Sequence, residues 1–261
     1  MNRRRALLLS GLLAARAEPS AWAQQRRSLA DPLRLGVDLA LIESGLAKAL
    51  QQGFGSDTGI AVQLAPGPAL PVLEALERAE FDAALCNAPE AEAGLEQQGL
   101  VHDRRAIARG EFVLVGPRLL GLAGGRDAAA TLVRIRDTAA AGAASFLSAN
   151  DGSGTHVAEQ ALWRAAQIAP VAPWYVAADS GRGLIAQSRE RHAYALVERG
   201  AWGLLGGAPL AVVGEGDPRL GEAVHVMRSF RVNHPAAKIF VAWIAGPKGR
   251  TIVAAQRSYR P

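Results

Sequence analysis

The chain has 261 residues, of which 49% are hydrophobic and 20% are charged, and its formal net charge is +5 at neutral pH. This composition excludes an intrinsically disordered chain and a collagen-like repeat. The single cysteine excludes an internal disulfide and the thiolate-rich zinc and iron–sulfur sites. The length suits either one large α/β domain or two lobes of about 100 residues each.

Residues 1–23 have the pattern of a secretory signal peptide. Three arginines (3–5) precede an apolar run of about ten residues, and Ala21-Trp22-Ala23 matches a cleavage site. The run is too short to span a membrane. We therefore expect a periplasmic protein, exported by the general secretory or the twin-arginine route. The alternative is an uncleaved basic N-terminal helix.

Much of the positive charge lies in this leader. Its removal takes away four of the 29 basic residues and one of the 24 acidic residues, so the mature chain carries a net charge of +2. Arginines downstream are interleaved with acidic residues rather than grouped into a basic stripe. We therefore expect no nucleic-acid partner.

Strand and helix patterns alternate along the first half of the mature chain. Strands are expected at 33–37, 60–64, 81–86 and 111–117, and helices at 46–58, 70–76 and 90–97. Strands joined by helices of this length pair in parallel through right-handed crossovers. The Gly116-Pro117 break then predicts the point at which the chain leaves a first lobe.

The second half repeats this alternation and then returns. Helices are expected at 132–144 and 156–168 and around Trp202, strands at 145–148, 194–197 and 211–213, and two final helices at 238–244 and from Pro247. The pattern predicts an α/β fold of two lobes, with mixed, mainly parallel sheets and two crossovers. We expect lobe 1 at 30–117, lobe 2 at 118–213 and a return to lobe 1 at 214–261, with a cleft between the lobes.

The strongest chemical signal is the segment from Ser148 to His156, Ser-Ala-Asn-Asp-Gly-Ser-Gly-Thr-His. Glycines let successive backbone N–H groups point the same way, and the helix N-terminus adds partial positive charge, so the segment suits an anion or a carboxylate. Ser153 and Thr155 can each donate a hydroxyl hydrogen bond. In the alternative interpretation, Asp151 or Ser153 only caps the helix.

A second glycine-rich turn covers residues 179–183 and contains Ser180 and Arg182. The arginine has the length and charge to reach an anion in the cleft. The alternative is a solvated surface arginine.

Several segments follow one another in a distinctive order: Glu43-Ser44-Gly45-Leu46, Phe112 to Pro117, Asp151 to His156, Arg199-Gly200 and Glu215 to Leu220. Together they resemble the tungstate-binding receptors of ABC importers, over about residues 33–255. The resemblance implies a type II periplasmic-binding-protein fold that closes over an oxoanion. It also implies delivery to a membrane permease, with no covalent chemistry. We expect no cofactor and no bound metal. We expect a monomer.

The chain departs from this family where the ligand is expected. Hydroxyl side chains of the family are replaced by Val37-Asp38-Leu39-Ala40, Pro68 follows Gly67, and Ala149 stands where the family has arginine. Loss of one arginine and two hydroxyls costs ~4 kcal/mol or more of binding energy, since charged hydrogen bonds contribute roughly 1.5–3 kcal/mol each. The ligand-binding residues we expect are Asp38, Gly67, Ser148, Asn150, Ser153, Gly154, Thr155, Ser180 and Arg182.

Asp38 is the departure with the largest consequence. A carboxylate about 5 Å from a unit negative charge repels it by ~3 kcal/mol at an effective dielectric of about 20. Three roles are open for Asp38: an ion pair with Arg182 across the cleft, contact with a cationic or zwitterionic solute, or capping of the next helix.

The sequence therefore leaves three functional hypotheses. The first is an exported receptor for a small anion or polar solute. The second is a signalling or scaffold protein on the same fold that has lost its ligand. The third is a hydrolase using Ser153 with His156, but a nucleophile elbow needs glycine where Asp151 stands. The five histidines show no metal-ligand spacing, so we favour the first.

Overall fold

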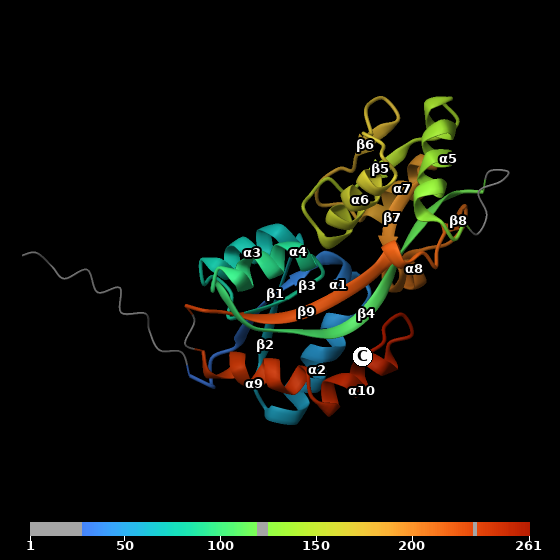
Figure 1. Cartoon of the computed structure of the whole chain (residues 1–261). Helices are drawn as coiled ribbons and strands as arrows, with labels where there is room; N and C mark the ends of the chain where they lie inside the picture. The colour runs from blue at the N-terminus through green and yellow to red at the C-terminus, as the bar shows by residue number, and fades with distance from the viewer. Residues whose placement is uncertain (1–27, 119–124, 232–233) are drawn as a thin grey trace, which may run out of the picture.

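The computed structural model describes residues 28–118, 125–231 and 234–261. The predicted signal peptide at 1–23 lies outside these residues. Figure 1 shows two α/β groups joined by two long strands that run side by side, β4 (Val101–Pro117) and β9 (Gly221–Ser229). Among the described residues, no helix is long and apolar enough to cross a membrane.

We call the group at the N-terminal end lobe 1 and the other group lobe 2. Lobe 1 holds β1 (Leu33–Asp38), α1 (Leu39–Glu43), α2 (Leu46–Thr58), β2 (Val62–Gly67), α3 (Ala69–Glu77), β3 (Ala83–Cys86), α4 (Pro89–Gln97), α9 (Pro235–Ile244) and α10 (Pro247–Ala255). Lobe 2 holds α5 (Ala128–Ala140), β5 (Phe146–Ser148), α6 (Gly154–Ala165), β6 (Tyr175–Ala177), α7 (Leu184–Arg191), β7 (Ala195–Glu198), α8 (Arg199–Leu205) and β8 (Leu210–Gly214). The boundaries expected after residues 117 and 213 stay predictions.

Both lobes share one seven-stranded sheet. Its order is β2-β1-β3-β9-β4-β7, and β8 also pairs with β4; β5 and β6 form a separate parallel pair. The expectation of mainly parallel pairing is wrong. β1 pairs in parallel with β2 and with β3, but every pair made by β4 or β9 is antiparallel. The sheet is mixed because these two strands run between the lobes in opposite directions.

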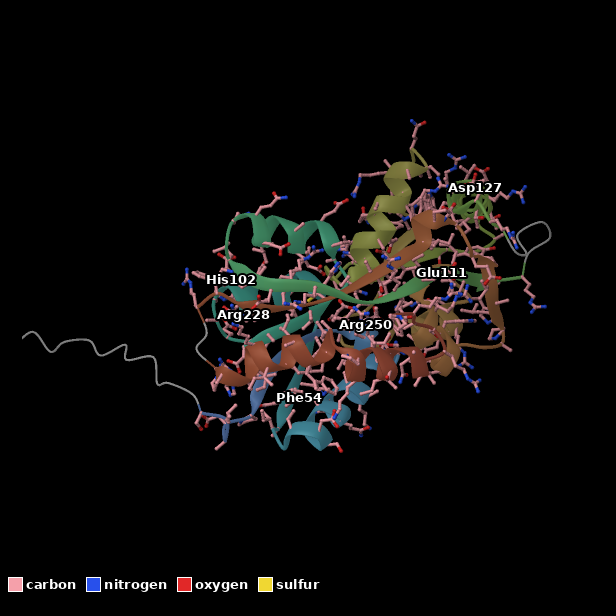
Figure 2. The ribbon with its side chains drawn as sticks, turned by 60° about the horizontal axis from the view of Figure 1, so that its bottom comes forward. Phe54, His102, Glu111, Asp127, Arg228 and Arg250 are labelled. Carbon is pink, nitrogen blue, oxygen red and sulfur yellow. The ribbon has the colours of Figure 1, made fainter. Side chains whose placement is uncertain are left out.

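The sequence pattern indicated neither the first part of β4 nor any of β9. The pairing of these strands is interrupted between His102 and Arg105 and between Ala106 and Ala108, where the register shifts. Such irregularities break the period-2 alternation by which a strand is recognised. Figure 2 shows His102 beside its register partner Arg228, and Glu111 further along β4 toward Asp127.

Two ion pairs of one arginine and a main-chain hydrogen bond fix the chain where β4 enters lobe 2. The Arg199 guanidinium donates to Glu111 at 2.8 Å and to Glu215 at 2.6 Å. The N–H of Gly216 also donates to Glu111, at 2.5 Å. These contacts join β4, the start of α8 and the returning segment.

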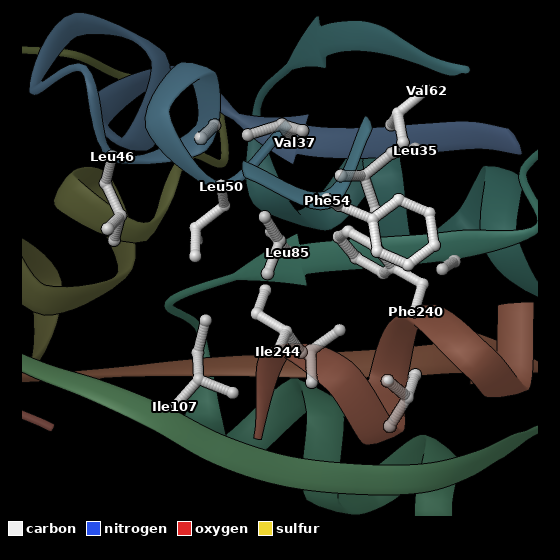
Figure 3. Packing of buried hydrophobic residues seen from close by; sticks show 14 of the residues in the cluster. Leu35, Val37, Leu46, Leu50, Phe54, Val62, Leu85, Ile107, Phe240 and Ile244 are labelled. Carbon is white, nitrogen blue, oxygen red and sulfur yellow. The ribbon is translucent and has the colours of Figure 1, made fainter. Parts of the chain in front are cut away.

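Each lobe has its own apolar core. In lobe 1, Leu35, Leu85 and Phe240 pack against Phe54, and all four are fully buried (Figure 3). The rings of Phe54 and Phe240 meet edge to face with 5.0 Å between centroids. In lobe 2, Phe146, Trp163 and Tyr194 form the centre of a second core. Each lobe therefore buries enough apolar surface to hold its own face of the site.

Helix boundaries follow local capping. The helix predicted at 46–58 is confirmed: α2 covers Leu46–Thr58 and is followed by Gly59, whose φ of 71° is the left-handed conformation typical of a helix C-terminus. The helix predicted at 132–144 instead covers Ala128–Ala140, because the Asp127 carboxylate caps it by accepting from the Ala130 N–H at 3.0 Å.

Truncation of Phe54 to alanine removes the centre of the lobe 1 core. We expect Phe54→Ala to lower the free energy of unfolding by about 3–5 kcal/mol, through lost burial and the cavity left behind. The matched control is Leu204→Ala, because Leu204 is 67% exposed and its truncation is expected to be nearly neutral. Urea denaturation measures both, and equal effects would contradict this packing.

Candidate functional site

A pocket of about 600 Å³ lies between the lobes. Its walls come from the ends of elements: the start of α1 and the loop before α3 in lobe 1, and the loops before α6, α7 and α8 in lobe 2. Glycine-rich and hydroxyl-bearing loops face it from lobe 2. The lining residues are Leu39, Ala40, Glu43, Pro68, Ala149, Asn150, Asp151, Ser153, Thr155, residues 178–185, Val197, Glu198 and Ala201.

Five of the nine expected site residues line this pocket. They are Asn150, Ser153, Thr155, Ser180 and Arg182. The other four do not line it, but each is adjacent in the chain to a residue that does: Asp38, Gly67, Ser148 and Gly154. Gly67 ends β2 immediately before the lining residue Pro68. The structure therefore gathers the loop before α6 and the turn before α7 at one pocket. Their role in ligand binding stays a prediction.

Ser153 caps α6. Its Oγ accepts from the backbone N–H of His156 at 3.2 Å, and its own N–H donates to the Asp151 carboxylate at 2.8 Å. The capping interpretation offered by the sequence is thus confirmed for Ser153. Capping uses an oxygen lone pair and leaves the hydroxyl proton available for another acceptor.

The same contacts separate the two side chains of the hydrolase hypothesis. The Nδ1 atom of His156 accepts from the Gly152 N–H at 3.1 Å. The Oγ of Ser153 is engaged by the main chain of His156 rather than by its ring. The described contacts therefore contain no proton-accepting imidazole on this hydroxyl, which a serine nucleophile requires.

Asp38 links the two lobes. Its side chain is fully buried. Oδ1 accepts from the Ala40 N–H at 3.0 Å, and Oδ2 accepts from the Gly154 N–H of lobe 2, also at 3.0 Å. Burial raises the pKa of this carboxyl to about 6, although the N–H donors favour its charged form.

One of the three roles considered for Asp38 is confirmed and one is wrong. It caps α1 through Ala40. It does not pair with Arg182, whose guanidinium lies at the surface and contacts Glu190 at 2.7 Å and Asp179 at 3.5 Å. The partner of Asp38 across the cleft is a main-chain N–H, because a fully buried carboxylate at the α6 N-terminus finds donors there without bringing in a flexible cation.

Close main-chain packing surrounds this link. The N–H of Leu70 in α3 donates to the Gly152 carbonyl of lobe 2 at 2.9 Å. A methyl group at Gly154 would overlap the Asn87 amide of lobe 1. We call Asp38, Leu70, Asn87, Gly152 and Gly154 the interlobe junction. Only glycine fits at position 154 while the lobes touch in this way.

The pocket also contains carboxylates that the sequence pattern did not single out. Glu198 caps α8 by accepting from the N–H groups of Gly200 and Ala201, and burial raises its pKa to about 6. Burial also raises the pKa of Glu43, on the opposite wall. The Glu-Arg-Gly sequence after a buried strand was the available signal for the cap at Glu198.

Ser148 lies at the end of β5, next to a buried acid on α6. The Glu159 carboxylate accepts from the Tyr175 hydroxyl at 2.6 Å and from the Trp163 indole at 3.1 Å. Burial nevertheless raises its pKa to about 7. Ser148 is itself fully buried and does not line the pocket.

No group of three or more histidine, cysteine, aspartate or glutamate side chains is placed to hold a metal ion within the described part of the chain.

A family model, the PBP superfamily domain, matches residues 40–247. The chain belongs to the PBP superfamily. The match covers both lobes and the return segment. The two-lobed α/β architecture is therefore that of this superfamily, as the resemblance implied.

Relatives within the superfamily are tungstate-binding proteins. Tungstate-binding protein TupA of Peptoclostridium acidaminophilum is 26% identical over 255 residues, covering 95% of this chain and 88% of that protein. The solved tungstate ABC transporter protein of Geobacter sulfurreducens is 28% identical with a TM-score of 0.73, covering 86% of this chain and 98% of that one. TupA of Desulfovibrio alaskensis G20 is 27% identical with a TM-score of 0.68, covering 88% and 99%.

The close approach at Gly154 gives a stability prediction. We expect Gly154→Ala to destabilise the protein by about 1–3 kcal/mol, because the added methyl group overlaps Asn87 and forces the junction apart. Gly94→Ala on α4 is the matched control, since a methyl group there meets nothing within 4 Å and is expected to stabilise by up to about 1 kcal/mol. Thermal unfolding measures the stability of both variants. A Gly154→Ala variant as stable as the wild type would contradict the junction geometry.

The buried Glu159 carboxyl is expected to make folding stability depend on pH. Because its folded pKa of about 7 lies above the ordinary 4.5, the folded protein binds more protons than the unfolded chain between these values, and this group's contribution to stability falls as pH rises through them. Glu159→Gln stays neutral, so we expect it to be more stable than the wild type by about 1–3 kcal/mol at about pH 8 and equal to it near pH 4. Urea titrations at both pH values measure the difference in the free energy of unfolding between Glu159→Gln and the wild type. An equal difference at pH 4 and pH 8 would contradict the raised pKa of Glu159.

Proposed function

We propose that this chain is an exported solute-binding protein that carries a small anion or polar solute between its lobes to the permease of an ABC importer, without catalysing a reaction. The observation that carries this proposal is the pocket lined by both lobes, at the loops before α1, α3, α6 and α7, in a chain of the PBP superfamily. The names of its tungstate-binding relatives support a small polar ligand and an ABC importer as the partner.

The groups proposed to contact the solute are those that reach the pocket. Asn150, Ser153 and Thr155 offer an amide and two hydroxyls at the start of α6, and Ser180 and Arg182 face them from the turn before α7. We propose that Asp38, Gly67, Ser148 and Gly154 shape the pocket from behind. Hydroxyl and amide groups of this kind fix the orientation of a polar solute.

We also propose a cellular location and an oligomeric state for this protein. The signal-peptide pattern at residues 1–23 supports a periplasmic protein, and we propose that the mature chain acts as a monomer with lobe boundaries after residues 117 and 213. The engagement of Ser153 in capping supports a binding role rather than hydrolysis.

A ligand screen with a pocket-filling variant tests the proposal. Tungstate, molybdate, sulfate, amino acids and amines are each added at millimolar concentration, and thermal unfolding is followed. We expect at least one solute to raise the melting temperature of the wild type, since stabilisation follows RT ln(1 + [L]/Kd). Ala178→Trp, which places an indole in the pocket, is expected to abolish this shift.

The control is Ala130→Trp, an exposed position on α5 outside the pocket, which is expected to keep the shift. If no solute stabilised the wild type, or if Ala178→Trp responded as the wild type does, the receptor function would fail. A ligand-less scaffold on the same fold would then be favoured.

A further inference from the structure

Helix N-termini from both lobes converge on one carboxylate. The N–H of Gly154, at the start of α6 in lobe 2, donates to Oδ2 of Asp38 at 3.0 Å. The N–H of Ala69, at the start of α3 in lobe 1, also favours the charged form of this carboxylate. Free N–H groups and the helix dipole attract anions to such positions. Asp38 therefore supplies, from within the chain, the negative charge that these termini attract.

This carboxylate lies directly behind the pocket. Its side chain is fully buried, and the pocket wall in front of it is made of residues adjacent in the chain to Asp38 and its donors. Asn87, 3% exposed, lies against Gly154 in the same junction, and its Oδ1 atom has no hydrogen-bond partner among the described residues. The adjacent wall residues are Leu39, Ala40, Pro68, Ser153 and Thr155.

Capping of α1 does not by itself explain Asp38. An N-cap needs one side-chain oxygen, and Oδ1 fills that role by accepting from Ala40. Oδ2 makes the bond to the other lobe. A serine caps a helix as well as an aspartate does, so the second oxygen and the charge serve the junction rather than the cap.

The charged groups that line the pocket have mostly the same sign as Asp38. Arg182 is the only lysine or arginine among the described lining residues, and its guanidinium contacts Glu190 and Asp179. A dianion entering the pocket therefore meets an excess of negative charge. The lining carboxylates are Glu43, Asp151, Asp179 and Glu198.

We propose that Asp38 is the specificity-determining residue of this site: its carboxylate holds the anion position between the N-termini of α3 and α6 and excludes dianions of the tungstate type. The pocket then takes a neutral or positively charged polar solute. This inference rests on the proposed function of the pocket and narrows its ligand class.

The test removes the negative charge of Asp38 and keeps a side chain that can cap α1. Asp38→Ser retains a capping hydroxyl and leaves the junction N–H groups to a free anion. Sodium tungstate is titrated by calorimetry into the wild type and the variant at about pH 8, where a carboxyl with a pKa of about 6 is ionised. We expect the variant to bind tungstate at least about 100-fold more tightly than the wild type, since this is the gain from removing the repulsion of a single unit charge and tungstate carries two.

The matched control removes a charge from the same pocket and leaves Asp38 in place. Asp151→Ser does this, because Asp151 lines the pocket and a serine can still accept from the Ser153 N–H. We expect a gain in tungstate affinity of less than about tenfold, since this carboxylate is solvated and screened. Circular dichroism confirms that each variant is folded, and Asp38→Thr replaces the serine variant if that one does not fold.

Two outcomes would overturn the inference. Either the folded Asp38→Ser and Asp38→Thr variants bind tungstate no more tightly than the wild type, or Asp151→Ser gains as much tungstate affinity as Asp38→Ser. Failure of the receptor function is a separate result. If the wild type binds none of the solutes but Asp38→Ser binds tungstate more tightly, only the proposed function is rejected. If the wild type binds one of the solutes but Asp38→Ser gains no tungstate affinity, only this inference is rejected.

Discussion

The antiparallel pairing of β4 with β9 is the constraint on which the site depends. Its register runs from Val101 opposite Ser229 to Glu111 opposite Gly221. These two strands carry the chain between the lobes, so they fix the distance and direction in which each lobe presents its loops (Figure 1). The ion pairs of Arg199 with Glu111 and Glu215 hold the end of this ladder. Without a defined ladder, the helix termini that build the pocket would not face one another.

Given that frame, the interlobe junction is shaped by a buried acid. Taking a carboxylate out of water is costly unless donors replace the lost hydration. Asp38 finds its donors on helix termini of both lobes, at Ala40 and Gly154. The raised pKa shows that these donors offset only part of the cost of burial. The same bonds that satisfy the carboxylate draw the lobes together, which couples the local chemistry of one side chain to the geometry of the pocket.

Local signals along the chain were enough to place most elements and the loop that precedes α6. Gly59 ends α2 where the pattern predicted, and Ser153 is the cap that the motif allowed. The strands that cross between the lobes were harder to recognise, since register shifts near His102 and Ala106 hide their alternation. Residues paired between β4 and β9 lie more than 100 positions apart in the chain, beyond any local pattern.

What the sequence by itself determined is the alternation of strands and helices, the two-lobed α/β class and the hydroxyl-rich loop, because these follow from periodicity and capping within short segments. Tertiary structure alone decided which groups meet. It kept Ser148 out of the pocket lining, brought Glu43 and Glu198 to the pocket walls, and paired Asp38 with Gly154 instead of Arg182. The physical reason is that a buried carboxylate takes the nearest fixed donors, and their positions are known only once both lobes are packed.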